Sequence, residues 1–145
     1  MHAPVASQAL DSERIVIRPK SDQIAYLAGS QWSDRLPKLV QARLIQTFEN
    51  SRLLARVGRP GDRLAADRTL DSELRNFEID IEAGQAVVEI SVKLVNERSG
   101  RIVDAKIFRA VSPASGASGE AASQALDTAL GEAMRAIVAW ASPRA

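Results

Sequence analysis

Two long stretches of the chain carry apolar residues at intervals of three and four, the spacing of one helix face. The first stretch, from Ser33 to about Asn50, has the stripe Leu36, Leu39, Val40, Leu44, Ile45 and Phe48. The second, from about Glu120 to Ala141, has the stripe Ala122, Leu126, Ala129, Leu130, Ala133, Met134, Ile137, Val138 and Ala141. The pattern predicts two amphipathic helices, each with one face buried.

Helix-start signals precede the first of these stripes. Ser33 is predicted to be the N-cap, and Asp34 to lie in the first turn, where the helix dipole stabilises a carboxylate. Pro37 also falls in the first turn, where its missing N–H is tolerated. At the other end of the chain, Pro143 is expected to stop the second helix.

Between and before the helices, the apolar period changes to two, which is typical of strands. Strands are expected at residues 14–18, 23–27, 53–57, 68–81, 88–95 and 101–111. In the long strand 68–81 the apolar residues move from even to odd positions near Arg75-Asn76, which predicts a β-bulge there. The last two strands should form a hairpin, with Val103, Ala105 and Ile107 on its inner face.

This element order predicts an α+β fold, a two-layer sandwich in which two amphipathic helices pack on a largely antiparallel sheet. A chain of 145 residues fits one domain. We expect the domain to span residues 13–142, and residues 1–12 to be an irregular lead-in, with an edge strand at Val5–Leu10 as the alternative.

Charge and composition exclude several functions. The chain has 19 basic and 18 acidic residues, well mixed, whereas nucleic-acid binding needs a concentrated positive face. It has no cysteine, so disulfides, thiolate metal sites and a cysteine nucleophile are excluded. No apolar stretch approaches the ~20 residues that cross a bilayer, and no signal peptide is visible.

Catalytic chemistry has few candidate residues. The single histidine is His2, at the end of the chain, so we expect neither a general base nor a metal ligand there. Glu78, Asp80 and Glu82 alternate with apolar residues and should form the solvent face of a strand. Two more carboxylates, Asp62 and Asp67, should form exposed ion pairs. We therefore expect no enzyme activity, no cofactor and no metal site.

Aromatic side chains near the first helix are more informative. Tyr26 and Trp32 bracket the segment ahead of the helix, where aromatic residues either staple the helix start to the core or anchor a partner protein. Tyr26, Trp32, Asp34 and Pro37 are therefore candidate partner-binding residues. The same two interpretations, core packing and a contact between subunits, stay open for Trp140.

In this order, several short motifs resemble the ABC-type transport auxiliary lipoprotein family, including its PqiC-like members. The motifs are Arg14–Pro19, Gln23–Leu27, Trp32–Pro37, Leu39–Leu44, Phe48–Ser51, Leu74–Phe77, Gly100–Val103, Phe108-Arg109 and the Ala-rich last helix with Trp140. The resemblance covers about residues 10 to 141. The family's signal peptide, lipobox cysteine and opening Tyr-x-Leu strand are not found in this chain, so we expect the lipid-anchored form to be a longer precursor.

The resemblance implies a periplasmic lipoprotein anchored to the outer membrane, working beside the permease, ATPase and substrate-binding protein of a mammalian-cell-entry (MCE) system that moves phospholipids. We expect a non-catalytic adapter that docks the MCE protein at the outer membrane, and that forms a homo-oligomer. The alternative is a carrier that holds a lipid such as a phospholipid in an apolar groove between helices and sheet. The chain as given, without an anchor, is expected to be soluble.

Overall fold

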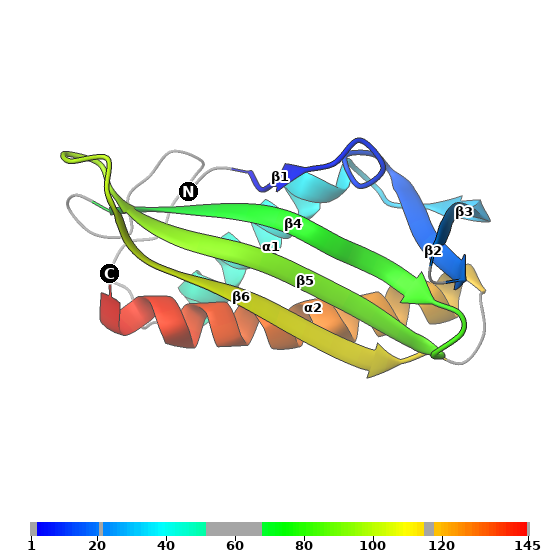
Figure 1. The fold of residues 1–145 in the computed structure, drawn as a ribbon. Helices are drawn as coiled ribbons and strands as arrows, with labels where there is room; N and C mark the ends of the chain where they lie inside the picture. The colour runs from blue at the N-terminus through cyan, green and yellow to red at the C-terminus, as the bar shows by residue number, and fades with distance from the viewer. Residues whose placement is uncertain (1–2, 21, 52–67, 115–117, 145) are drawn as a thin grey trace.

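The fold is a six-stranded, mostly antiparallel sheet covered on one face by two helices, in a computed structural model that describes residues 3–20, 22–51, 68–114 and 118–144 (Figure 1). The elements in chain order are β1 (Val5–Ala6), β2 (Arg14–Lys20), β3 (Gln23–Gln31), α1 (Leu36–Ser51), β4 (Arg68–Asp80), β5 (Gln85–Asn96), β6 (Ile102–Pro113), α2 (Gly119–Ala141) and the 3₁₀ turn η1 (Ser142–Arg144). The predicted α+β sandwich is confirmed.

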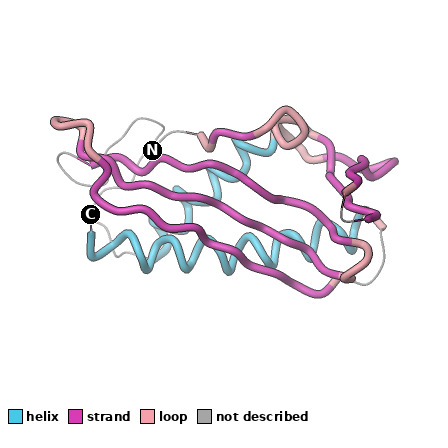
Figure 2. The backbone as a smooth tube through the Cα atoms, viewed as in Figure 1, coloured by secondary structure: helices cyan, strands magenta, loops and turns pink. Residues whose placement is uncertain are grey.

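The sheet runs in the order β3-β2-β4-β5-β6, and β1 pairs with β4 in parallel beside it. Three long strands, β4, β5 and β6, lie side by side along the molecule, with both helices on one side of them (Figure 2). β2 also pairs with β4 in parallel, so β1 lies beside the middle of β4 and β2 beside its C-terminal end. At the start of the chain, β1 is a strand of only two residues within the range of the edge-strand alternative.

The core lies between the helices and the inner face of the sheet. Fully buried residues from α1, β4, β5 and α2 include Phe48, Leu70, Ile90, Leu126 and Met134. The whole predicted apolar stripe of α2 is buried. The Ser118 hydroxyl caps this helix by accepting a hydrogen bond from the backbone N–H of Ala121. Small alanines in the stripe let α2 lie close to the sheet.

The predicted bulge in the long strand is confirmed. Leu74 pairs with Ile90, but the next pair in register is Asn76 with Glu89, so Arg75 is the additional residue. The extra residue returns Phe77 to the inner face, opposite Val88. A bulge therefore keeps both halves of β4 in contact with one core.

The predicted face of β6 was wrong. Its pairing with β5 places Phe108 opposite Ile90 and Ala110 opposite Val88, so these residues face the core. Since side chains alternate along a strand, Val103, Ala105 and Ile107 are exposed on the other face. Alternation alone does not say which face of a strand is buried; the register with the neighbouring strand does.

Element boundaries differ from the prediction around α1. This helix begins at Leu36 and has no acidic residue in its first turn, so Ser33 is not its N-cap and Asp34 lies outside it. Pro37 is within the first turn, as expected. β3 continues through Gly29, whose positive φ of 78° suits glycine. The strand expected at 53–57 lies outside the described residues.

Candidate functional site

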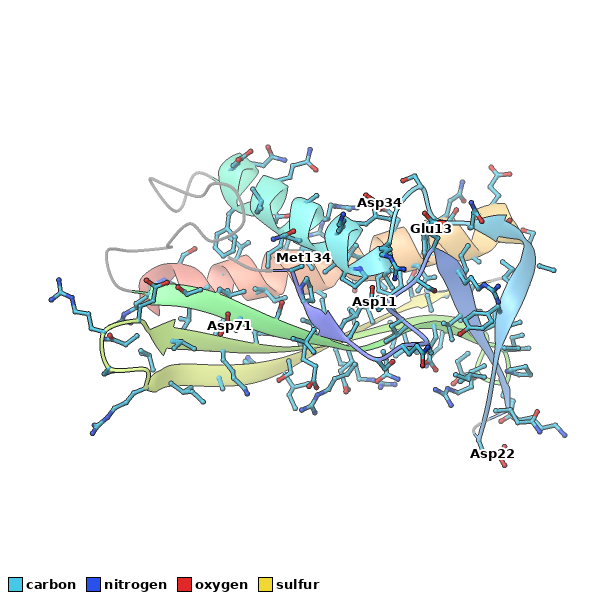
Figure 3. All side chains as sticks on the ribbon, turned by 90° about the horizontal axis from the view of Figure 1, so that it is seen from above. Asp11, Glu13, Asp22, Asp34, Asp71 and Met134 are labelled. Carbon is cyan, nitrogen blue, oxygen red and sulfur yellow. The ribbon has the colours of Figure 1, made fainter. Side chains whose placement is uncertain are left out.

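A groove between the two helices is the first candidate site. It is lined by Trp32, Leu36, Leu39, Ala42, Arg43, Gln46, Phe77, Ser123, Asp127 and Leu130, and has a volume of about 320 Å³. The helices lie next to each other on one side of the sheet (Figure 3). Arg43 of α1 forms an ion pair with Asp127 of α2, so the groove is bridged by a charge pair that joins its two walls.

Trp32 lies where β3 leads into α1, and its position explains how the groove is built. Its backbone N–H donates to the carbonyl of Glu13, 2.7 Å away, which holds this segment to the start of β2. Its indole ring packs edge-to-face on Phe77, with ring centroids 5.7 Å apart and planes at 77°. Such pairs contribute about 0.5–1.5 kcal/mol beyond area burial. The ring is partly buried against the core, which is the contact that one of the two interpretations of Trp32 predicted.

The Trp32 indole also carries an unsatisfied donor. Its Nε1 is shielded from solvent and has no hydrogen-bond partner among the described residues. A buried N–H without an acceptor costs roughly 1–3 kcal/mol, and native structures hold few such groups. Trp32, which lines the apolar groove, thus has an indole N–H that destabilises the fold because it lacks an acceptor.

The structure separates the four residues predicted as a partner-binding surface. Tyr26 is exposed on β3, with the Arg14 guanidinium stacked 5.0 Å from its ring centroid. Asp34 is exposed just before α1, where its carboxylate accepts from the backbone N–H of Arg35 at 2.7 Å. Pro37 is buried, and Trp32 lines the groove. Only Tyr26 and Asp34 therefore present exposed side chains to a partner.

Acidic side chains gather near Asp34. Asp11, Glu13 and Asp34 lie near the start of α1 in Figure 3. Arg35 crosses this region, donating from Nη1 to the Asp11 carbonyl at 2.7 Å and to its carboxylate at 3.2 Å. These groups are exposed, and the contacts tie the N-terminal segment to the helix start. No sequence motif predicts these contacts.

β3 is the more unusual surface, because it is an edge strand exposed on both faces. Of its nine residues, only Leu27 and Ser30 are partly buried. Ile24 is 50% exposed and Tyr26 is 42% exposed. Residues Gln23–Gln31 include no charged side chain, whereas edge strands of soluble proteins are commonly protected by charges. The other edge strand, β6, has that protection in Asp104, Lys106 and Arg109.

Glu78 is buried, which corrects the expectation of a solvated strand face. It does lie on the sheet face opposite the helices, between inward-facing Phe77 and Ile79, but its side chain is only 7% exposed. Both its oxygens accept hydrogen bonds from Arg18 of β2, and Asn76 Nδ2 donates to Oε1 at 3.1 Å. Asp80 is partly buried and its charge acts to raise the Glu78 pKa, whereas Glu82 is exposed.

The environment of this ion pair sets its protonation. Burial acts to raise the pKa of the Glu78 carboxyl, but the hydrogen bonds from Arg18 and Asn76 outweigh burial and leave the pKa below its usual value. The hydrogen bond to Glu78 raises the pKa of Arg18. Glu78 therefore stays ionised, which suits a structural ion pair and not a proton donor near neutral pH.

Other candidate chemistry is sparse in the described part of the chain. No three of its His, Asp and Glu side chains gather closely enough to hold a metal ion. None of its helices has the length and hydropathy needed to span a membrane. His2, Asp62 and Asp67 lie outside the described residues. What the geometry offers is an exposed apolar edge strand and a groove, both suited to binding.

Known proteins share parts of this sequence and this fold. Over 138 residues the chain is 30% identical to bll6063, an uncharacterized protein of Bradyrhizobium diazoefficiens; the match covers 94% of this chain and 37% of that protein. The chain thus spans little more than a third of that relative's length. Protein XCC0632 from Xanthomonas campestris has a similar crystal structure, with a TM-score of 0.88 and 26% identity, covering 97% of this chain and 81% of that one.

A second crystal structure, of an uncharacterized protein, shares the fold with a TM-score of 0.79 at 15% identity, covering 94% of this chain and 86% of that one. The decisive match is to a family model, which spans residues 1–138 and is described as the ABC-type transport auxiliary lipoprotein component. The resemblance seen in the sequence motifs is thus confirmed over nearly the whole chain. The protein belongs to the ABC-type transport auxiliary lipoprotein family.

Proposed function

We propose that this domain is a non-catalytic adapter that docks the MCE protein of an ABC-type lipid transport system at the outer membrane. Family membership supports an auxiliary role in ABC-type transport and an envelope-anchored protein. The described residues include no cluster that could hold a metal ion, and the buried Glu78 stays ionised, which supports a binding role. In this proposal the periplasmic domain is held at the outer membrane by a lipid anchor on the precursor, and works as a homo-oligomer.

The observation that carries the docking proposal is the state of β3. The backbone of an uncharged edge strand can pair with a further strand from a partner protein. Because β3 is exposed on both faces, the partner can also contact its side chains on either face. Tyr26 is the aromatic anchor on this strand, and aromatic residues contribute strongly at interfaces. Asp34 is an exposed charge next in the chain, suited to the polar rim of the same interface.

The experiment measures binding of the purified MCE protein of the same transport system by biolayer interferometry. Ile24→Asp introduces a charge on β3, and we expect it to weaken binding at least tenfold, because a desolvated carboxylate would enter the interface. Ile107→Asp is the matched control, since Ile107 is also an isoleucine on an edge strand and is also 50% exposed. Circular dichroism checks that both variants keep the fold.

Two further substitutions test the predicted surface residues. Tyr26→Ala and Asp34→Lys should each weaken the complex. The loss caused by the charge reversal in Asp34→Lys should be smaller at high salt, because salt screens the new repulsion. The docking proposal fails if Ile24→Asp binds as tightly as the unmodified chain. It also fails if Ile107→Asp weakens binding more than Ile24→Asp, because the interface would then lie on β6.

A further inference from the structure

The groove between α1 and α2 has the composition of a small-molecule site. Its walls are mainly apolar, from Leu36 and Leu39 on α1, Phe77 on β4 and Leu130 on α2. Its polar groups are few, and the charged ones, Arg43 and Asp127, neutralise each other. Ligand pockets commonly combine an apolar lining with a small number of polar groups that orient the ligand.

The size of the groove limits what fits. A volume of about 320 Å³ lies at the lower end of the range for ligand pockets, roughly 300–1,000 Å³. A single hydrocarbon chain suits this volume, whereas a lipid with two chains or an amphipathic peptide helix is too wide. Because the charges of Arg43 and Asp127 cancel, the groove does not require a ligand whose polar end carries a net charge.

The polar requirement comes from Trp32. Its indole N–H is a donor that lacks an acceptor among the described residues, and it belongs to a residue of the groove lining. A ligand with an acceptor oxygen would satisfy it, and so recover the free energy that this buried N–H costs. Because Nε1 is shielded from water, such a ligand has to displace side chains of the groove wall as it enters.

We propose that the groove between α1 and α2 binds a single acyl chain, whose carboxyl or ester carbonyl oxygen accepts a hydrogen bond from Trp32 Nε1. The chain lies along the apolar walls formed by Leu36, Leu39 and Leu130. This site is distinct from β3 and does not depend on the docking proposal. The acyl group belongs either to a free fatty acid or to a single-chain phospholipid.

The experiment follows the two indole N–H resonances of the protein by two-dimensional NMR. Dodecanoate and lauroyl-lysophosphatidylcholine, each kept below its micelle concentration, represent the two sources of an acyl chain. We expect at least one of them to move the Trp32 resonance downfield in a saturable manner, as hydrogen bonding to an oxygen does. Trp140 is the internal control, because it packs edge-to-face on Phe108 and does not line the groove.

Matched variants place the ligand in the groove. Ala42 is an exposed residue of α1 that lines the groove, so Ala42→Phe fills it and should weaken binding at least tenfold. Ala136→Phe adds the same side chain at an exposed position of α2 outside the groove, and should leave the affinity within twofold. Trp32→Phe keeps the ring but removes the donor, and should cost about fivefold, the worth of one hydrogen bond.

The proposal is overturned if neither compound moves the Trp32 resonance, if Trp140 responds equally, or if Ala42→Phe binds as well as Ala136→Phe. It is also overturned if only the MCE protein moves the Trp32 resonance, because the groove would then be a protein-docking site. Failure here is separable from failure of the docking proposal. Ile24→Asp leaves the groove intact, and Ala42→Phe leaves β3 intact.

Discussion

The ion pair between Arg18 and Glu78 gives a sharp test of how burial controls stability in this sheet. The pair joins β2 to β4 on the sheet face away from the helices. Its partners are unequally buried, with exposed side-chain fractions of 26% for Arg18 and 7% for Glu78. Removing one partner or the other should therefore have different costs, which Arg18→Met and Glu78→Gln measure.

The expected magnitudes follow from what each variant leaves behind. Arg18→Met leaves a buried carboxylate with only Asn76 as a hydrogen-bond donor, and we expect a loss of about 3 kcal/mol in unfolding free energy at neutral pH. Glu78→Gln keeps an acceptor oxygen of the same shape, and the guanidinium it leaves is hydrated through its exposed side. We expect that variant to lose about 1 kcal/mol.

The contribution of Glu78 to the pH dependence of stability should have opposite signs in the unmodified chain and in Arg18→Met. In the unmodified chain the folded-state pKa of Glu78 is lowered, so its contribution is present above the unfolded pKa of about 4.3 and is lost as pH falls through the folded value. In Arg18→Met, burial without the guanidinium should raise the Glu78 pKa above the unfolded value. As pH falls, Glu78 becomes protonated in Arg18→Met and no longer places an unpaired charge in a buried position. The difference in unfolding free energy between this variant and the unmodified chain should therefore become smaller.

Urea unfolding followed by circular dichroism, at about pH 7 and about pH 4, measures all three proteins under the same conditions. The reasoning would be refuted if Arg18→Met lost no more stability than Glu78→Gln at the higher pH. It would also be refuted if the deficit of Arg18→Met stayed constant or grew on acidification. Glu78→Gln is the internal control, since it has no carboxyl at this position to titrate.

Three substitutions in α2 test its packing by the same unfolding assay. Gly119→Ala should lower the unfolding free energy by about 1–3 kcal/mol, since the new Cβ would lie 1.9 Å from the Ser30 hydroxyl oxygen and 2.8 Å from the Ser30 Cβ. If no stability is lost, β3 can move away from α2 freely. Gly131→Ala should be neutral or gain up to about 1 kcal/mol, because its Cβ meets only the tips of two arginine side chains, at 3.3 and 3.4 Å; a clear loss would contradict this. Leu126→Ala should cost about 3 kcal/mol, because Leu126 is fully buried, and a cost under about 1 kcal/mol would argue against the core described here.

Prediction from the sequence succeeded where local pattern and core burial agree. The stripe of α2 repeats over its whole length and all of it is buried, so the pattern predicted both the helix and its buried face. The bulge near Arg75 was also predictable, because both halves of β4 carry strongly apolar residues and an extra residue within one strand changes the parity of its inward positions.

Prediction failed where two faces of a strand are both apolar or where a charge finds a distant partner. β6 has apolar residues on both faces, and the register with β5 decides that Phe108 is buried and Ile107 exposed. Glu78 looked like a solvated residue because its partner Arg18 is sixty positions away in the sequence. No local pattern records such a pairing.

The candidate sites show the same division. Tyr26 and Asp34 were recognisable as surface candidates because aromatic and charged residues stand beside a predicted helix start, and both are exposed. The groove was not recognisable, since Trp32, Ala42 and Asp127 meet only when α1 and α2 pack on one face of the sheet. The sequence by itself determined the elements, the α+β class and the family, because periodicity and motifs are local properties of the chain. Tertiary structure alone decided which strand stays uncovered and which donor stays unsatisfied, because both depend on contacts between distant segments.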